Sequence, residues 1–261
     1  MAMKVTKVDN ELMHIMPFSG SRKREKGYSI DRMWGKKHYV ISSYETLNHT
    51  DMIVFFQIIN DFLSHQKQWI PAGDVDGTPL IKREFSINAL TNERLGNTNQ
   101  HNRQTTLQSI DRIKSITLRA QYPESNLVVD TWYFHKIEAD RTKFTKCVIV
   151  ANKYFIEYCI RGGIRINYGR LIRYGNNSYS AILDAFLQSN KNKNFSSRNY
   201  YAEKTIIEAL QLDKTNMTHR DIHYTIQEAF NTVHIIGGLP RYVFIKATQQ
   251  WCLENYLESM Q

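Results

Sequence analysis

Two histidines, His219 and His223, stand four residues apart in a stretch with helical character. On a helix this spacing puts both imidazoles on one face, which is how zinc hydrolases hold their metal. In those enzymes a glutamate base follows the first histidine, but here Arg220 takes that position and no third ligand is evident. We therefore expect no metal here, and we interpret the histidines as exposed or phosphate-contacting side chains.

Other catalytic motifs are missing from the sequence. It has no Gly-x4-Gly-Lys-Ser/Thr loop for a nucleotide, no Gly-x-Ser-x-Gly turn for a serine hydrolase and no His-x-His triplet for a rolling-circle nickase. The cysteines Cys147, Cys159 and Cys252 are odd in number and form no Cys-x-x-Cys pair. We expect a protein that is not an enzyme, has no cofactor and keeps free thiols in a reducing cytoplasm.

The charge balance favours a polyanionic partner. The chain of 261 residues has a formal net charge of +9 and a pI near 9.3, which suits nucleic acid or an anionic membrane surface. No run of residues is apolar and long enough to cross a bilayer, and the first residues lack the apolar core of a signal peptide. Double-stranded DNA is therefore the predicted partner, and no membrane is expected.

A helix beginning at Thr218 is the first predicted DNA-reading element. Thr218 and Asp221 form a capping box, and an apolar stripe follows at helical spacing. The opposite face carries side chains that can bond to base edges or phosphates in a major groove: His219, Arg220, Tyr224, Gln227 and Asn231. The alternative is a solvated face, because Asp221 and Glu228 would repel phosphate. A hairpin with its turn at Gly237–Gly238 should follow, and it contains Arg241.

A second polar-faced helix is predicted over residues 98–115. Arg103, Thr106, Leu107, Ile110 and Ile113 share one face, which is opposite the exposed face. The side chains expected to contact DNA from this helix are His101, Arg103, Gln104, Thr105, Gln108 and Arg112. A core helix over residues 50–65 and a short helix ending near Gly96 precede it, and hairpins follow it, so both halves of the chain show the same order of elements.

Gly162–Gly163 marks the predicted boundary between the halves, after a helix capped by Asn152. We expect an irregular basic arm at residues 1–37, a first domain at 38–162 and a second at 163–261. The second should open with a strand over 164–174 and contain helices over 198–210 and 247–257. The cations around the boundary form a predicted basic seam: Arg141, Lys143, Lys146, Lys153, Arg161, Arg165, Arg170 and Arg173. We expect them to contact phosphate, together with Lys191 and Lys193 in the loop after residue 188.

The layout from about residue 40 to residue 246 resembles the replication initiator (Rep) proteins of iteron-bearing plasmids, including the TrfA-like group. The residues that carry the likeness are the runs 164–172, 179–187 and 220–230. The resemblance implies an α+β fold of two tandem winged-helix domains. It also implies binding to repeated sites at a replication origin, help in opening the duplex, recruitment of host replication proteins, and a homodimer that represses its own gene.

Two other classes of function remain open at this level. A transcriptional regulator with tandem winged helices would bind DNA without opening it. A protein–protein adaptor would bind its partner with little dependence on salt, whereas phosphate contacts make affinity fall steeply as salt rises. An enzyme of an unrecognised kind is a further alternative, although no motif favours one.

Overall fold

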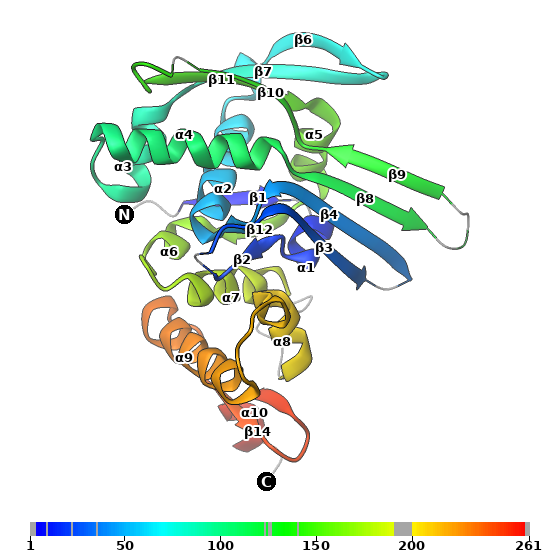
Figure 1. Cartoon of the computed structure of the whole chain (residues 1–261), viewed down its shortest axis with the longest axis vertical. Coiled ribbons are helices and arrows are strands. Elements are labelled where there is room, and N and C mark those ends of the chain that lie inside the picture. The colour runs from blue at the N-terminus through cyan, green and yellow to red at the C-terminus, as the bar shows by residue number, and fades with distance from the viewer. Residues whose placement is uncertain are drawn as a thin grey trace.

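A computed structural model of the chain describes residues 4–8, 10–21, 23–34, 36–122, 124, 127–139, 141–190 and 200–258 (Figure 1). The helices are α1 (Asn10–Ile15), α2 (His49–Ser64), η1 (Gln66–Gln68), α3 (Ile87–Leu95), α4 (Gln100–Lys114), α5 (Lys153–Gly162), α6 (Tyr168–Ile172), α7 (Ser178–Ser189), α8 (Glu203–Leu210), η2 (Leu212–Lys214), α9 (His219–Gly237) and α10 (Glu254–Glu258). The predicted α+β class is confirmed. Among the described residues, no helix is long and apolar enough to span a bilayer.

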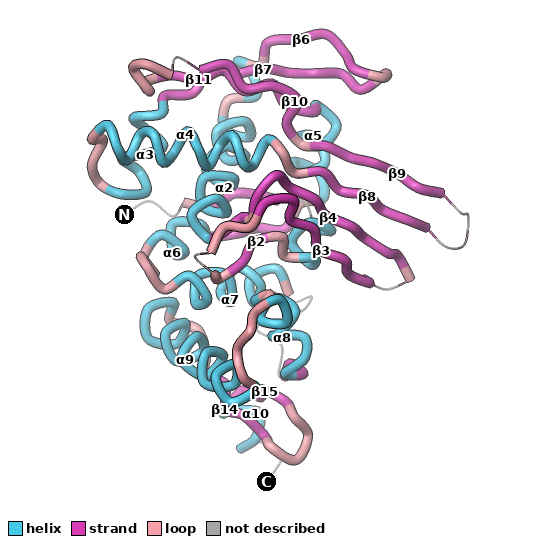
Figure 2. The backbone as a smooth tube through the Cα atoms, viewed as in Figure 1, coloured by secondary structure: helices cyan, strands magenta, loops and turns pink. Residues whose placement is uncertain are grey.

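The strands are β1 (Val5–Val8), β2 (Phe18–Ser19), β3 (Lys26–Trp34), β4 (Lys37–Glu45), β5 (Leu47–Asn48), β6 (Ile70–Val75), β7 (Thr78–Ser86), β8 (Thr117–Tyr122), β9 (Leu127–Trp132), β10 (Phe134–Ala139), β11 (Lys146–Asn152), β12 (Ile164–Asn167), β13 (Tyr200–Ala202), β14 (Tyr242–Ile245) and β15 (Gln250–Leu253). In the described part of the chain they form two four-stranded sheets, β10-β11-β7-β6 and β3-β4-β8-β9, a three-stranded sheet, β13-β15-β14, and the pairs β1-β12 and β2-β5. The sheet β3-β4-β8-β9 extends to one side of the molecule (Figure 2).

The two halves repeat one succession of elements. In the first half α2, β7, α3, α4, β10 and β11 follow one another, and in the second half α7, β13, α8, α9, β14 and β15 do so. In the first half β11 lies between β7 and β10, and in the second half β15 lies between β13 and β14, so the last strand is central in both sheets. The first half differs by the additional strand β6 at the edge of its sheet and by the inserted hairpin β8–β9, which joins β3–β4 in a separate sheet. The polar-faced helices α4 and α9 therefore occupy equivalent places.

Helix α2 lies at the centre of the core. Asn48 caps it, because its side chain accepts hydrogen bonds from the backbone of Thr50 and Asp51, and Asp51 bonds back to the Asn48 N–H. Its apolar residues, including Phe55 and Phe62, are almost completely buried. They belong to a single buried cluster that continues into α7 of the second half. The halves consequently share one core.

The predicted irregular arm is wrong in the described residues. β1 pairs antiparallel with β12, with Val5 opposite Asn167 and Val8 opposite Ile164. α1 packs against α7, and β3 pairs along its length with β4. The expectation failed because each of these strands gains its partner by tertiary pairing, which the composition of the segment alone does not indicate.

Three predicted elements of the second half are corrected. The predicted strand over 164–174 ends at Asn167, whose side chain caps α6 by accepting from the Arg170 N–H. In the described part of the predicted helix over 198–210, residues 200–202 form the strand β13 and α8 begins at Glu203. The predicted closing helix over 247–257 contains the strand β15 at Gln250–Leu253, where Trp251 is buried against α9, and is helical only from Glu254 in α10.

The predicted hairpin after α9 also lies later in the chain. α9 continues to Gly237, and Gly238 ends it in the left-handed conformation with φ +65°. The hairpin consists of β14 and β15, with Tyr242 opposite Leu253.

Candidate nucleic-acid interface

Helix α4 presents part of its predicted polar face to solvent. Asn99 caps it by accepting from the Asn102 N–H, and Leu107, Ile110 and Ile113 are buried beneath it. The side chains of His101, Gln104 and Gln108 are exposed, whereas Thr105 is half-buried and donates to the His101 carbonyl at 3.0 Å. The exposed groups are uncharged amides and an imidazole, which suit hydrogen bonding to base edges.

The two arginines expected to contact DNA from α4 are partly buried. Arg112 donates to Asp51 Oδ1 from Nη2 at 2.9 Å and from Nε at 3.1 Å. Its side chain is 12% exposed, and that of Asp51 is fully buried. Arg103 is half-buried, and its Nε atom has no hydrogen-bond partner among the described residues. The structure thus places Arg112 in an internal ion pair beside the exposed face.

A groove of about 640 Å³ runs beside the C-terminal part of α4. Gln108, Asp111 and Lys114 line it from the helix, and Tyr44 lines it from β4. Asp111 is bound to Arg141 by two hydrogen bonds, of 2.9 and 3.0 Å. The hydrogen bond with Asp111 raises the pKa of the Arg141 guanidinium above its ordinary value. Arg141 therefore neutralises the acid that flanks the α4 face.

Helix α9 has the predicted cap residue Thr218 and the predicted two faces, but Asp221 bonds to the Thr218 hydroxyl and does not complete the predicted capping box. Thr218 accepts from the Asp221 N–H and donates to its carboxylate at 2.7 Å. Ile226, Ala229, Phe230 and Val233 are buried, and Phe230 stacks on Trp251 with ring centroids 4.9 Å apart. His219, Arg220, Tyr224 and Gln227 are exposed, and Asn231 is half-buried. Both acids on this face, Asp221 and Glu228, are also exposed.

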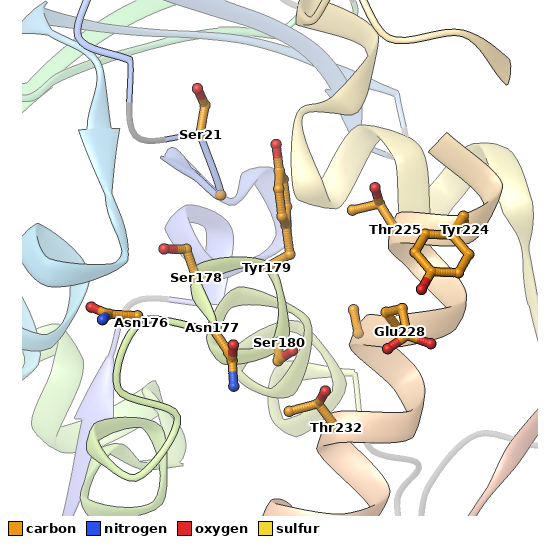
Figure 3. A pocket seen from close by; sticks show the side chains of 12 residues that line it. Ser21, Asn176, Asn177, Ser178, Tyr179, Ser180, Tyr224, Thr225, Glu228 and Thr232 are labelled. Atoms are coloured by element: carbon orange, nitrogen blue, oxygen red, sulfur yellow. The ribbon is translucent and has the colours of Figure 1, made fainter. Parts of the chain in front are cut away.

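A groove of about 510 Å³ separates α9 from the first turn of α7 (Figure 3). Tyr224, Thr225, Glu228 and Thr232 line it from α9. The facing wall consists of the first turn of α7 and the residues before it, together with Gly20 and Ser21. Most lining side chains are hydroxyls and amides, and Glu228 is the charged residue among those that the structure describes there. The groove extends the polar surface of α9 with hydrogen-bonding groups.

The two histidines of the zinc-like spacing both face Glu203 of α8. His223 Nδ1 lies 2.7 Å from Glu203 Oε1, and His219 Nε2 lies 3.9 Å from Glu203 Oε2. The His223 ring also stacks on Trp251 with centroids 5.4 Å apart. His223 therefore ties α9 to α8 and to the hairpin, whereas His219 remains exposed at the start of the helix.

The predicted basic seam is partly neutralised by acidic side chains, both near and distant in the sequence. Lys146 pairs with Glu84 at 2.7 Å, and Arg170 pairs with Asp184 at 2.5 Å. Lys153 lies 3.7 Å from Glu157. Arg161, Arg165 and Arg173 are exposed and form no side-chain hydrogen bond or ion pair with the residues that the structure describes. These three arginines of the seam thus remain available to phosphate.

The other predicted contacts are scattered. Lys143 is exposed, and Arg241 is exposed but pairs with Glu254 at 3.2 Å. Lys191 and Lys193 lie outside the described residues. The structure consequently presents exposed polar residues of the predicted set on α4 and on α9, whereas the exposed cations Lys143, Arg165, Arg173 and Arg241 lie outside these helices.

Two buried aspartates were not predicted as important. Asp51 holds Arg112 and Arg24, and Asp184 of α7 holds Arg170, Tyr174 and Gln188. Burial raises the pKa of Asp184, and its bonds to Arg170 and Tyr174 oppose that shift. The sequence could have indicated that Asp51 completes a capping box with Asn48. It could not have indicated the two arginine partners of Asp51, because they come from elsewhere in the chain.

No known sequence family matches the chain, and no curated protein matches it in sequence. Its fold matches crystal structures of domains 2 and 3 of RctB. One, of selenomethionine derivatives, has a TM-score of 0.59 at 11% sequence identity and covers 86% of this chain and 85% of that one. The other has a TM-score of 0.55 at 10% identity, with 86% and 83% covered. The likeness is one of fold, and membership of the plasmid Rep proteins stays a prediction.

Proposed function

We propose that the chain is a double-stranded DNA-binding protein of the replication-initiator type, built from two tandem winged-helix units. In this proposal α4 and α9 are the base-reading helices, and the sheets that follow them supply the wings. The protein acts by binding and is not an enzyme. It works in the cytoplasm, where its DNA lies.

The observation that carries the proposal is the equivalence of α4 and α9. Each helix follows a core helix, a strand and a short helix, and each precedes two strands of one sheet. Each also exposes amide side chains, Gln104 and Gln108 on α4 and Gln227 on α9. Glutamine bonds bidentately to adenine in the major groove, so this pair of faces suits sequence-specific reading of a duplex.

The fold likeness supports the initiator assignment over other DNA-binding roles. The chain shares its fold with domains 2 and 3 of RctB, a replication initiator, over most of both chains. Together with the resemblance to plasmid Rep proteins, this favours binding to repeated origin sites and help in opening the duplex. Host replication proteins would then be further partners.

A homodimer belongs to the same proposal, and β9 offers a surface for it. β9 is an edge strand, and Leu127, Val128 and Val129 are 52%, 50% and 37% exposed. An exposed apolar edge is the kind of strand that pairs with another chain. Val128→Lys should lower the apparent mass in sedimentation if this edge joins two copies.

Protection mapping on the DNA that flanks the gene tests the function. We expect protected repeats with a regular spacing, and the absence of protection on any duplex would contradict DNA binding. A permanganate footprint with the host initiator present separates an initiator from a regulator, because only the initiator exposes unpaired thymines. Affinity that ignores salt would instead favour the protein–protein adaptor.

A further inference from the structure

Four residues of the N-terminal segment, Met16, Arg24, Tyr28 and Arg32, bind both halves of the molecule, and we call them the clasp. Met16 lies between α1 and β2, Arg24 lies before β3, and the other two lie on β3. Each clasp residue makes a hydrogen bond to a residue far away in the sequence. With the bond between Asp51 and Arg112, these hydrogen bonds connect α4 to the short segment that precedes α9.

Arg24 is the end of the clasp that holds the first half. Its Nη1 atom donates to Asp51 Oδ2 at 2.5 Å and to the Thr46 carbonyl at 2.6 Å. The other oxygen of Asp51 accepts from Arg112 of α4 at 2.9 Å. Since the Asp51 side chain is fully buried, it is held between the two guanidiniums. Arg24 is therefore connected to α4 through one carboxylate.

Arg32 is the end of the clasp that holds the second half. Its Nη2 atom donates to both carboxylate oxygens of Asp213, at 3.1 and 3.2 Å, and to the Glu208 carbonyl at 3.2 Å. The Arg32 side chain is 15% exposed, so water screens these bonds less than those of a surface pair. Asp213 lies on η2, in the short connection that leads into α9.

Gln211 is the residue of the second half to which the other two clasp residues, Met16 and Tyr28, are hydrogen-bonded. It ends α8, has a left-handed backbone with φ 56° and is 1% exposed. Its Nε2 atom donates to the Met16 carbonyl at 2.9 Å, and its Oε1 atom accepts from the Tyr28 hydroxyl. The amide thus uses its donor and its acceptor on two clasp residues. Breaking either bond would leave a buried polar group without its partner, which is costly.

The clasp connects two helices that lie well apart. α2, α6 and α7 lie between α4 and α9 (Figure 1). When two binding elements sit on one rigid body, the second contact is strongly favoured only if the ligand presents its two sites at the matching separation. A link that holds α4 and α9 at a fixed separation therefore controls which DNA they read together.

We propose that the clasp sets the spacing between the two DNA segments that α4 and α9 read. This inference rests on the proposed function, because it requires both helices to contact one duplex. It adds that the four clasp residues, which lie on neither α4 nor α9, determine specificity for spacing by holding the two halves together.

A distance measurement tests the mechanical part without DNA. Spin labels attached at two exposed positions, through Gln104→Cys and Gln227→Cys, report the distance between α4 and α9 in pulsed electron paramagnetic resonance. The native cysteines are buried, and the parent without the two new cysteines is the control for stray labelling. In the Tyr28→Phe/Arg32→Gln variant we expect a broader or shifted distance distribution. An unchanged distribution in the folded variant would overturn the proposal.

Two further variants make this measurement decisive. Lys36→Gln is the matched control, because it removes an exposed ion pair with Glu124 in the same sheet without touching the second half. It should leave the distribution unchanged. If circular dichroism shows that the double variant is not folded, Asp213→Asn is measured in its place. It removes only the charge from the partly exposed partner of Arg32, and it should shift the distribution in the same direction.

The spacing part is tested on the mapped DNA site. Inserting about five base pairs, half a turn of the duplex, between the two segments should weaken the wild type by about 100-fold. The same insertion should weaken DNA binding by the Tyr28→Phe/Arg32→Gln variant clearly less. If the wild type binds DNA and both proteins respond alike, the inference fails and the proposed function stands. If the wild type binds no duplex, the proposed function fails and the spacing inference with it.

Discussion

The guanidinium of Arg112 on α4 lies 2.9 Å from the carboxylate of Asp51 at the start of α2, and water does not reach that carboxylate. Removing one member of such a buried pair destabilises a protein, because the remaining charge loses a compensating partner. The pair fixes α4 on the core helix, with Gln104 and Gln108 facing outward. Orientation of the polar helix therefore depends on a contact inside the protein.

Arg112→Leu should destabilise the fold by about 1.5–3 kcal/mol, the usual contribution of hydrogen bonds to a charged group. Arg24 still compensates Asp51 in this variant, so the loss should stay within that range. Urea unfolding at neutral pH measures it. The control is Arg119→Leu, which removes an exposed pair with Asp130 and should leave the free energy of unfolding nearly unchanged. Equal effects of the two substitutions would contradict the role of the buried pair.

Gly237→Ala should loosen the contact between α9 and α7. A Cβ atom on residue 237 would collide with the hydroxyl of Tyr174, which donates to Asp184 at 3.0 Å. We expect a loss of about 1–3 kcal/mol, as is usual when a well-packed site is overfilled. In Gly162→Ala the new Cβ meets Tyr158 at an ordinary 3.5 Å, so this control should not be destabilised.

The Tyr174→Phe background provides an independent check of this contact. It removes the colliding hydroxyl, so the additional cost of Gly237→Ala should be smaller there than in the wild type. Thermal unfolding of the four proteins of this cycle gives the coupling. Additive effects would show that the hydroxyl does not limit the approach of α9.

His38 should titrate above its ordinary value. Its Nε2 atom lies 2.6 Å from Asp31 Oδ1. This hydrogen bond raises the pKa of His38 above 6.5, although slight burial of the ring lowers the pKa. Because the folded pKa is the higher one, the pair contributes stability fully below 6.5 and loses it as pH rises through the folded pKa. An NMR titration measures the midpoint, which Asp31→Asn should lower. A midpoint that does not respond to Asp31→Asn would contradict the pair.

Arg220→Glu should weaken DNA binding and reduce its salt dependence. Arg220 is exposed at the start of α9, and each phosphate contact that is lost lowers the slope of log affinity against log salt by about one. Gel-shift titration at several salt concentrations measures both quantities. Lys67→Glu on η1 makes the same change in net charge at another exposed position. An equal loss in both variants would indicate an effect of net charge alone.

The helices that we propose to contact DNA, and the core helix, could be predicted from the sequence. α2, α4 and α9 each combine a buried stripe at helical spacing with a capping residue, Asn48, Asn99 or Thr218. Both signals are local, so neither depends on a distant part of the chain. The exposed positions His101, Gln104, Tyr224 and Gln227 follow directly from that periodicity.

The parts that could not be predicted depend on long-range partners. β1 becomes a strand because β12 pairs with it across the whole first half, and β13 is a strand because β15 lies beside it. The same holds for charge, since Arg112 and Arg141 find Asp51 and Asp111 only after folding. Sequence order around a cation therefore says little about whether its charge is free.

Methylation protection on the mapped site tests most directly whether α4 and α9 read one duplex. The reagent marks guanines in the major groove, and the proteins compared are the wild type, Gln104→Ala and Gln227→Ala. We predict that the wild type protects two separate blocks on one side of the duplex and that each variant loses a different block. Identical protection by all three proteins would contradict the reading of DNA by these helices.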